Sequence, residues 1–143
     1  MKHAWDPANL DIRAFARAGG QLDGQTPLSA LPRLAEEQPV GDGALANAPI
    51  TWSLQGETRD VRGGAHQIWL HLKAQGHAAL MCQRCLSPMV EALSVDRQFR
   101  FVADEATAMA EDDEAEEDLL VLGPAFDALA LIEDELLMAL PLV

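Results

Sequence analysis

The feature that most constrains the fold is an apolar stripe near the C-terminus, in the stretch FDALALIEDELLMALPLV that begins at Phe126. Asp127 can cap a helix, because its carboxylate accepts from the first unpaired backbone N–H groups. The apolar residues that follow recur at helical spacing: Leu129, Ile132, Leu136 and Leu140, with Leu137 and Ala139 widening the stripe. Pro141 ends the helix because it has no N–H to donate. A stripe this apolar has to pack against another surface.

Alternating segments upstream offer that surface. Apolar and polar residues alternate, as they do in half-buried strands, over 50–55, 68–73, 78–82 and 93–101. Gln75-Gly76 predicts a hairpin turn between the second and third of these segments. The polar stretch 57–64 predicts a loop, and 119–122 a short edge strand. Trp52 and Trp69 lie on strands and are expected in the core.

The N-terminal part predicts helices. Asp6-Pro7 is a helix start, Leu10 to Ala18 form a loose apolar face, and Gly19-Gly20 ends it; an extended segment over 10–18 is the alternative. Ser29 is expected to cap a short second helix. We therefore predict one α+β domain over residues 1–143: a curved antiparallel sheet or partly open β-barrel, with an N-terminal helical segment and a C-terminal helix packed on the sheet.

Length and composition narrow the class of protein. A chain of 143 residues fits one domain, and no apolar run approaches the roughly 18 to 20 residues of a membrane span. The N-terminus shows no signal peptide, and two cysteines are too few for a disulfide scaffold. We expect a cytoplasmic protein that does not contact a membrane.

The negative charge is confined to the C-terminal part. Residues 1–103 hold ten acids and all ten Lys/Arg, whereas residues 104–143 hold thirteen acids and no base. Nine of those acids lie within 104–118, where like-charge repulsion predicts an exposed, mobile connector. Such a field repels phosphate and attracts basic partners. The alternative is a solvated tail that keeps the protein soluble.

The sequence CQRC at 82–85 has the spacing of a metal site. Cys82 and Cys85 can supply half of a tetrahedral Zn²⁺ site. No further Cys supplies the other half, although His71 and His77, on the hairpin that leads to the cysteines, could approach them. A thioredoxin-like redox role needs a helix that starts at the motif, whereas the residues after it predict a turn. We expect a structural turn and no cofactor, with zinc as the alternative.

The acidic residues are candidates for binding a basic partner. Within the connector they are Glu111, Asp112, Asp113, Glu114, Glu116, Glu117 and Asp118. Glu133, Asp134 and Glu135 form a second group, which spans about 200° of a helix and so cannot converge on one metal. Glu133 flanks the apolar stripe and is expected to pair with Arg97 or Arg100. Asp134 is expected to be solvated.

The arginines of the strand-rich part could gather on one face and contact phosphate, with Arg84, Arg97 and Arg100 as the predicted RNA contacts. No aromatic pair at ribonucleoprotein-motif spacing, no GxxG clamp and no tyrosine accompanies them. No phosphate-binding glycine loop and no Ser/His/Asp arrangement is legible. We predict neither a small-molecule substrate nor an enzyme.

The chain resembles the YceD family, the large ribosomal RNA subunit accumulation proteins. CQRC at 82–85, the acidic run and IEDELLMALP at 132–141 follow the order and spacing of that family, and the similarity covers roughly residues 45–143. Members usually continue past the final proline with a His and another Cys. This chain ends at Val143, so we expect a shortened form or a naturally short variant without those ligands.

The resemblance implies a non-enzymatic factor that supports accumulation or processing of the 23S rRNA of the large subunit. The charge layout adds the hypothesis that the acidic groups bind a basic ribosomal protein, or the pre-ribosomal large subunit, while the arginine face contacts rRNA. A zinc- or thiol-dependent protein that uses Cys82 and Cys85 is the alternative.

Overall fold

The structure, a computed structural model, describes residues 5–36, 48–60, 66–81, 88–111, 117–123 and 125–140. Its helices are α1 (Ile12–Arg17), the 3₁₀ turn η1 (Leu28–Ala30), α2 (Pro32–Glu36), α3 (Glu105–Glu111) and α4 (Ala128–Ala139). Its strands are β1 (Gln21–Pro27), β2 (Pro49–Arg59), β3 (Gln67–Met81), β4 (Pro88–Val102) and β5 (Asp118–Val121). No helix in the described part of the chain is long and apolar enough to cross a membrane.

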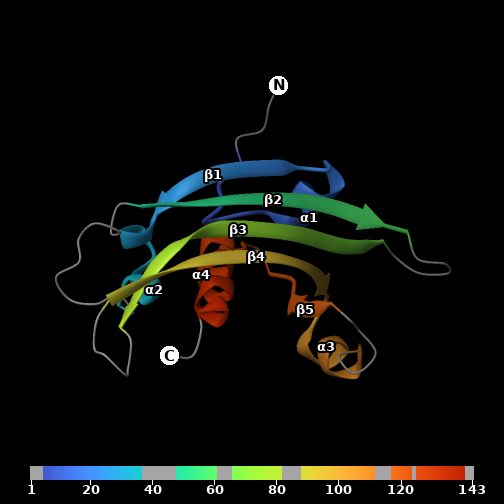
Figure 1. The fold of residues 1–143 in the computed structure, drawn as a ribbon. Helices are drawn as coiled ribbons and strands as arrows, with labels where there is room; N and C mark the ends of the chain where they lie inside the picture. Colours follow the sequence, from blue (N-terminus) through green and yellow to red (C-terminus); the bar gives the residue numbers. More distant parts are fainter. Residues whose placement is uncertain are drawn as a thin grey trace. The chain divides into compact units, whose positions relative to one another are not determined.

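The strands form one open, five-stranded sheet in the order β1-β2-β3-β4-β5. Strands β1 to β4 run in alternating directions (Figure 1), so this part of the sheet is antiparallel, as predicted. The predicted edge strand near residue 119 is also confirmed, but β5 pairs with β4 in parallel, with Asp118 opposite Phe99 and Val121 opposite Val102. The sheet is therefore mixed rather than wholly antiparallel, and it does not close into a barrel.

Two details of the predicted strands are also wrong. Gln75-Gly76 is not a turn, because β3 runs unbroken through it. A Cβ on Gly76 would lie 2.4 Å from Ile50 Cδ1, so this glycine lets two strands approach closely. The predicted loop at 57–64 begins too early, since β2 continues to Arg59. β1 was not predicted at all: its sequence is polar and, as an edge strand, it has no fully buried residue.

The chain divides into two compact units that share the long strands. Unit 1 comprises residues 1–22, 53–72 and 96–129, and therefore contains α1, α3 and β5. Unit 2 comprises residues 23–52, 73–95 and 130–143, and contains η1, α2 and most of α4.

Unit 1 has a core in which α1 packs closely on β2. The predicted N-terminal helix is confirmed, but it starts later than predicted: Asp11 is its cap and accepts from Ala14 N at 3.2 Å. Phe15 is fully buried, and a Cβ on Gly56 would lie 2.6 Å from its ring. The glycine in β2 therefore determines how near the helix can come.

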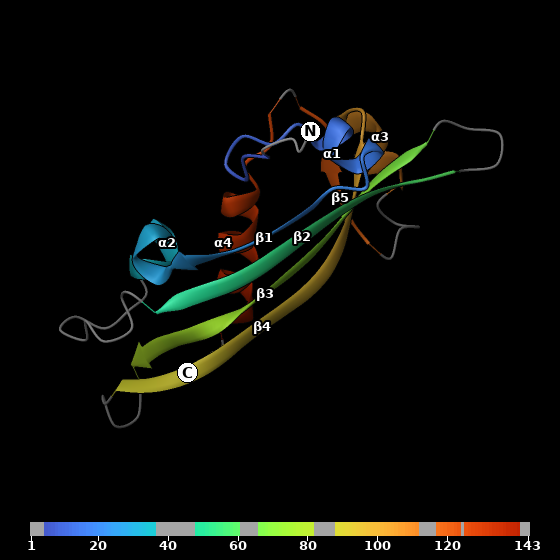
Figure 2. The same ribbon diagram turned by 90° about the horizontal axis from the view of Figure 1, so that it is seen from above.

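Unit 2 has a core formed by α4 and the strands that it crosses (Figure 2). Ile132 and Leu136 are 1% and 0% exposed, as predicted for the apolar stripe, and Leu131 is also buried. Leu140 is only half-buried, so the apolar face of the helix lies slightly to one side of the predicted stripe. On β2, Trp52 is buried and its Nε1 donates to Thr26 Oγ1 at 2.9 Å.

The acidic run contains more regular structure than its charge predicts. Glu105–Glu111 form α3, and Asp104 caps it by accepting from Thr107 N at 2.7 Å. None of the residues of α3 is buried. The backbone N–H of Thr107 is the largest cause that lowers the pKa of Asp104. Within α3 only Glu105 and Glu111 are acidic, and the cap at Asp104 stabilises the start of the helix.

Candidate functional site

Unit 1 carries a cluster of arginines and carboxylates at the end of β2, on β4, at the end of α3 and at the start of β5. We call it the arginine–carboxylate cluster, and its members are Arg59, Arg97, Arg100, Glu111, Glu117 and Asp118. The parallel register of β5 places Asp118 opposite Phe99. Phe99 lies two residues after Arg97 on β4, so the two side chains point to the same face of the strand. Arg97 and Asp118 form an ion pair whose side chains are 44% and 48% exposed.

Arg100 is the buried member of the cluster. Its Nε lies 3.0 Å from Glu117 Oε1 and its Nη2 lies 3.2 Å from Glu111 Oε1, and only 10% of its side chain is exposed. A guanidinium at this depth is tolerated because carboxylates pair with it. Two residues of the acidic segment therefore cover an arginine of the sheet.

Arg59 lies flat over an aromatic ring on the same face of unit 1. Its guanidinium carbon is 3.8 Å from the centre of the Trp69 ring, a distance typical of a cation–π contact. Arg59 Nε donates to Glu57 Oε1 at 2.8 Å, and its Nη2 is 3.4 Å from Gln98 Oε1. Trp69 is 9% exposed, as predicted for a core residue.

These side chains surround an open depression of about 390 Å³. Its lining residues are Arg59, Trp69, Asp96, Arg97, Gln98, Glu117 and Asp118. The lining thus brings two guanidinium groups and three carboxylates to one small, largely polar surface.

Glu117 is held in its charged form by the arginines around it. Burial of its carboxylate raises its pKa, but the hydrogen bonds from its own backbone N–H and from Arg100 lower the pKa. The positive charges of Arg100 and Arg59 lower it further, so that the pKa of Glu117 lies below its ordinary value of 4.5. The Glu117 carboxylate is therefore an anion that the positive charges of Arg100 and Arg59 stabilise.

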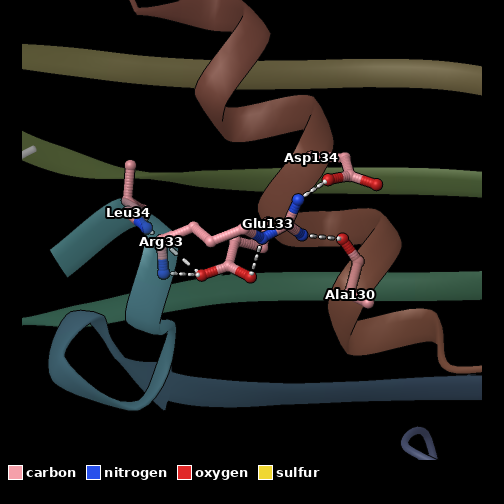
Figure 3. Close-up of polar contacts among 5 residues, drawn as sticks. All are labelled: Arg33, Leu34, Ala130, Glu133 and Asp134. Atoms are coloured by element: carbon pink, nitrogen blue, oxygen red, sulfur yellow. Dashed lines mark hydrogen bonds and ion pairs between the residues drawn. The ribbon is translucent and has the colours of Figure 1, made fainter. Parts of the chain in front are cut away.

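Unit 2 carries a second polar cluster, between α2 and α4 (Figure 3). Glu133 Oε2 accepts from the backbone N–H groups of Arg33 at 2.7 Å and of Leu34 at 3.2 Å. Glu133 Oε1 accepts from Arg33 Nε at 3.0 Å. The Arg33 guanidinium also lies 2.5 Å from Asp134 Oδ1 and 3.4 Å from the carbonyl oxygen of Ala130.

This second cluster changes the interpretation of the acids at 133–135. Glu133 does form a structural ion pair, but its partner is Arg33 of α2, so the predicted pairing with Arg97 or Arg100 is wrong. Asp134 is paired with Arg33 rather than simply solvated. Hydrogen bonds to Asp134, the larger cause, and to Glu133 raise the pKa of Arg33. Glu133 and Glu135 are buried, at 5% and 4% exposure.

No metal site is found in the described part of the chain, where no three His, Cys, Asp or Glu side chains converge. Cys82, Cys85 and Arg84 lie outside the described residues. His71, which the sequence suggested could approach the cysteines, has its Nε2 2.5 Å from Asp96 Oδ1.

The structure brings together two groups that the sequence assigned to different partners. Arg97 and Arg100 were predicted to contact RNA, and Glu111, Glu117 and Asp118 were predicted to bind a basic protein; in unit 1 they bind each other. Asp112, Asp113, Glu114 and Glu116 lie outside the described residues. The sequence predicted no partner for Arg33 or Arg59, because nothing near either residue indicates a distant partner.

Comparison with known proteins gives one family. The model described as "Large ribosomal RNA subunit accumulation protein YceD" matches residues 70–143, which is about half of the chain. The matched part contains most of β3, all of β4 and β5, and the helices α3 and α4. The search of curated proteins and the search of solved structures found no match.

Proposed function

Because the chain belongs to the YceD family of large ribosomal RNA subunit accumulation proteins, we propose that it is a non-enzymatic factor in biogenesis of the large ribosomal subunit. In this role it supports accumulation or processing of 23S rRNA. The family is associated with ribosome biogenesis and is not a known enzyme family. Catalysis by the CQRC residues finds no support in it.

The charge layout supports a narrower proposal about the partner. Residues 104–143 hold thirteen acids and no Lys or Arg. An acidic surface of this kind attracts basic proteins over about 8 Å at physiological salt. Ribosomal proteins that bind rRNA are the basic partners to be expected at this stage, and the protein would shield or deliver one of them in the cytoplasm.

The exposure of the acidic side chains supports some of them as contacts of such a partner. Glu111 and Asp118 are 42% and 48% exposed in their side chains, so a basic side chain can reach them. Glu133 and Glu135 are buried in unit 2 and are better explained as structural groups. The proposed partner surface is therefore centred on 111–118, and in unit 2 on Asp134 alone among the three acids of α4.

A capture experiment tests the proposal. The tagged chain is used to capture ribosomal proteins at moderate salt, before and after Asp112, Asp113, Glu114 and Glu116 are replaced by Asn or Gln. The matched control neutralises four acids of the charge-balanced part: Asp23, Glu36, Glu37 and Asp42. We expect loss of capture in the first variant alone. Equal capture by all three proteins would refute the assignment of the acidic segment.

A second experiment tests the cellular role. Depletion of the protein should lower the ratio of 23S to 16S rRNA, and the wild-type chain should restore it. A chain in which Cys82 and Cys85 are replaced by serine should restore it as well. Failure of that variant, together with zinc in the purified protein, would favour the zinc- or thiol-dependent alternative.

A further inference from the structure

The carboxylate of Glu117 lies where guanidinium groups from two strands converge. Arg100 of β4 donates to it at 3.0 Å, and the charge of Arg59 on β2 acts on it as well. Arg59 and Arg97 line the same depression as Glu117. Glu117 is thus an anion that Arg100 binds directly and that shares one depression with Arg59 and Arg97.

Such a centre has the donors that a phosphate group needs. Guanidinium groups bind carboxylates and phosphates with the same planar N–H donors. The Arg97–Asp118 pair is exposed on both sides, and exposed ion pairs contribute little to stability, whereas the side chain of Arg100 is only 10% exposed. A phosphate can therefore replace Asp118 on Arg97 without disrupting the core of unit 1.

We infer that the depression lined by Arg59, Arg97 and Glu117 is a binding site for the phosphodiester backbone of RNA, which the protein's own Glu117 and Asp118 occupy in the free state, while Glu111 pairs with the neighbouring Arg100. The acids act as an intramolecular competitor: RNA binds well only when these carboxylates are neutralised or engaged elsewhere. This inference rests on the proposed function, because it identifies the surface that would meet rRNA.

The competition links the two proposed partners. A basic protein that binds Glu111, Glu117 and Asp118 would release the arginines for RNA, and RNA bound to the arginines would release the acids for the protein. Binding of each partner therefore favours binding of the other, by the reciprocity that governs coupled equilibria. The free protein, with both surfaces paired to each other, is expected to bind RNA weakly.

The test measures RNA affinity after the competing acids are neutralised. The competitor-free variant carries Glu111→Gln, Glu117→Gln and Asp118→Asn. Its binding to a fluorescein-labelled single-stranded RNA of about 20 nucleotides is followed by anisotropy between about 50 and about 200 mM KCl. We expect at least about tenfold tighter binding than wild type at the lowest salt. The salt slope should steepen by about 1.4, because each of two new phosphate contacts adds about 0.7.

Two further proteins make the result specific. The matched control, Asp23→Asn, Glu36→Gln and Asp60→Asn, changes the net charge equally but leaves the cluster intact, so its salt slope should stay that of wild type. Adding Arg59→Gln and Arg97→Gln to the competitor-free variant should remove the gain. An equal gain in the control, or a gain that survives loss of both arginines, would overturn the inference.

Misfolding of the competitor-free variant and failure of the proposed function are each detected by a separate measurement. If circular dichroism shows that the competitor-free variant does not fold, Asp118→Asn alone should steepen the slope by about 0.7 over Asp23→Asn, and an unchanged slope counts against the inference. The proposed function fails separately, if depletion of the protein leaves the 23S to 16S ratio unchanged.

Discussion

Replacement of Glu133 by alanine is expected to destabilise the protein through its backbone contacts rather than through its ion pair. The carboxylate accepts two backbone N–H groups at the start of α2, from Arg33 and Leu34. Leu34 is fully buried, so its N–H would lose its acceptor where water has little access, at a cost of about 1–3 kcal/mol. Loss of the ion pair with the Arg33 guanidinium should cost less, because half of the Arg33 side chain is exposed to water.

The free energy of unfolding should therefore fall by about 3 kcal/mol in Glu133→Ala. The buried N–H of Leu34 and the N–H of Arg33 account for about 2 kcal/mol, and the lost methylene contacts for about 1 kcal/mol. Arg33→Met removes the guanidinium but keeps both backbone donors capped, and should cost less than about 1 kcal/mol. Glu133→Gln keeps one acceptor oxygen and should fall between these two.

Urea unfolding, followed by far-ultraviolet circular dichroism, measures the three variants beside the wild type. Slopes equal to that of wild type would show that the changes act on stability rather than on the unfolded chain. The reasoning is refuted if Arg33→Met costs as much as Glu133→Ala, or if Glu133→Ala costs less than about 1 kcal/mol. Either result would mean that the backbone N–H groups at the start of α2 find other hydrogen-bond acceptors.

Three further predictions concern the cores and the charge cluster. Leu136→Asp places a charge at a fully buried position of α4 and should abolish cooperative thermal unfolding; a melt near the wild-type temperature would contradict this. Gly56→Ala would bring a Cβ to 2.6 Å from the Phe15 ring and should cost about 1–3 kcal/mol, whereas Gly123→Ala, with its nearest atom at 3.9 Å, should be close to neutral in the same urea titration. Because the pKa of Glu117 is lowered in the folded state, its contribution to stability is complete above its ordinary value of 4.5 and is lost as pH falls through the folded pKa. The stability difference between wild type and Glu117→Gln should accordingly shrink between pH 6 and pH 3, and a pH-independent difference would show that the charge of Glu117 is not what stabilises it.

The elements that the sequence predicted well are those with a strong local period. Alternation over β2 and β4 follows from side chains that point to opposite faces of a strand. The leucine spacing of α4 follows from the 3.6-residue helical turn. β1 was missed because an edge strand with one half-buried face needs no apolar alternation, and Gly76 was misread because a glycine in a strand and a glycine in a turn look alike in sequence.

The candidate site was predicted in its residue types and not in its arrangement. Arg97, Arg100 and the acids of 111–118 stood out by their charge. Their mutual pairing depends on the parallel addition of β5 to β4, and a strand of four residues carries no record of the direction in which it will pair. The predicted partners of the two charge groups were therefore external, whereas the structure gives each group a partner within the chain.

The sequence by itself determined the periods of the strands and of the last helix, the base-free acidic end and the family. These are properties of neighbouring residues and of composition. Only the tertiary structure decided that Glu133 holds the start of α2, 100 positions earlier in the chain, and that Glu117 lies among arginines of the sheet. Ion pairs and backbone caps between distant segments depend on how the chain packs, because a carboxylate can satisfy any donor that the fold brings within about 3 Å of it.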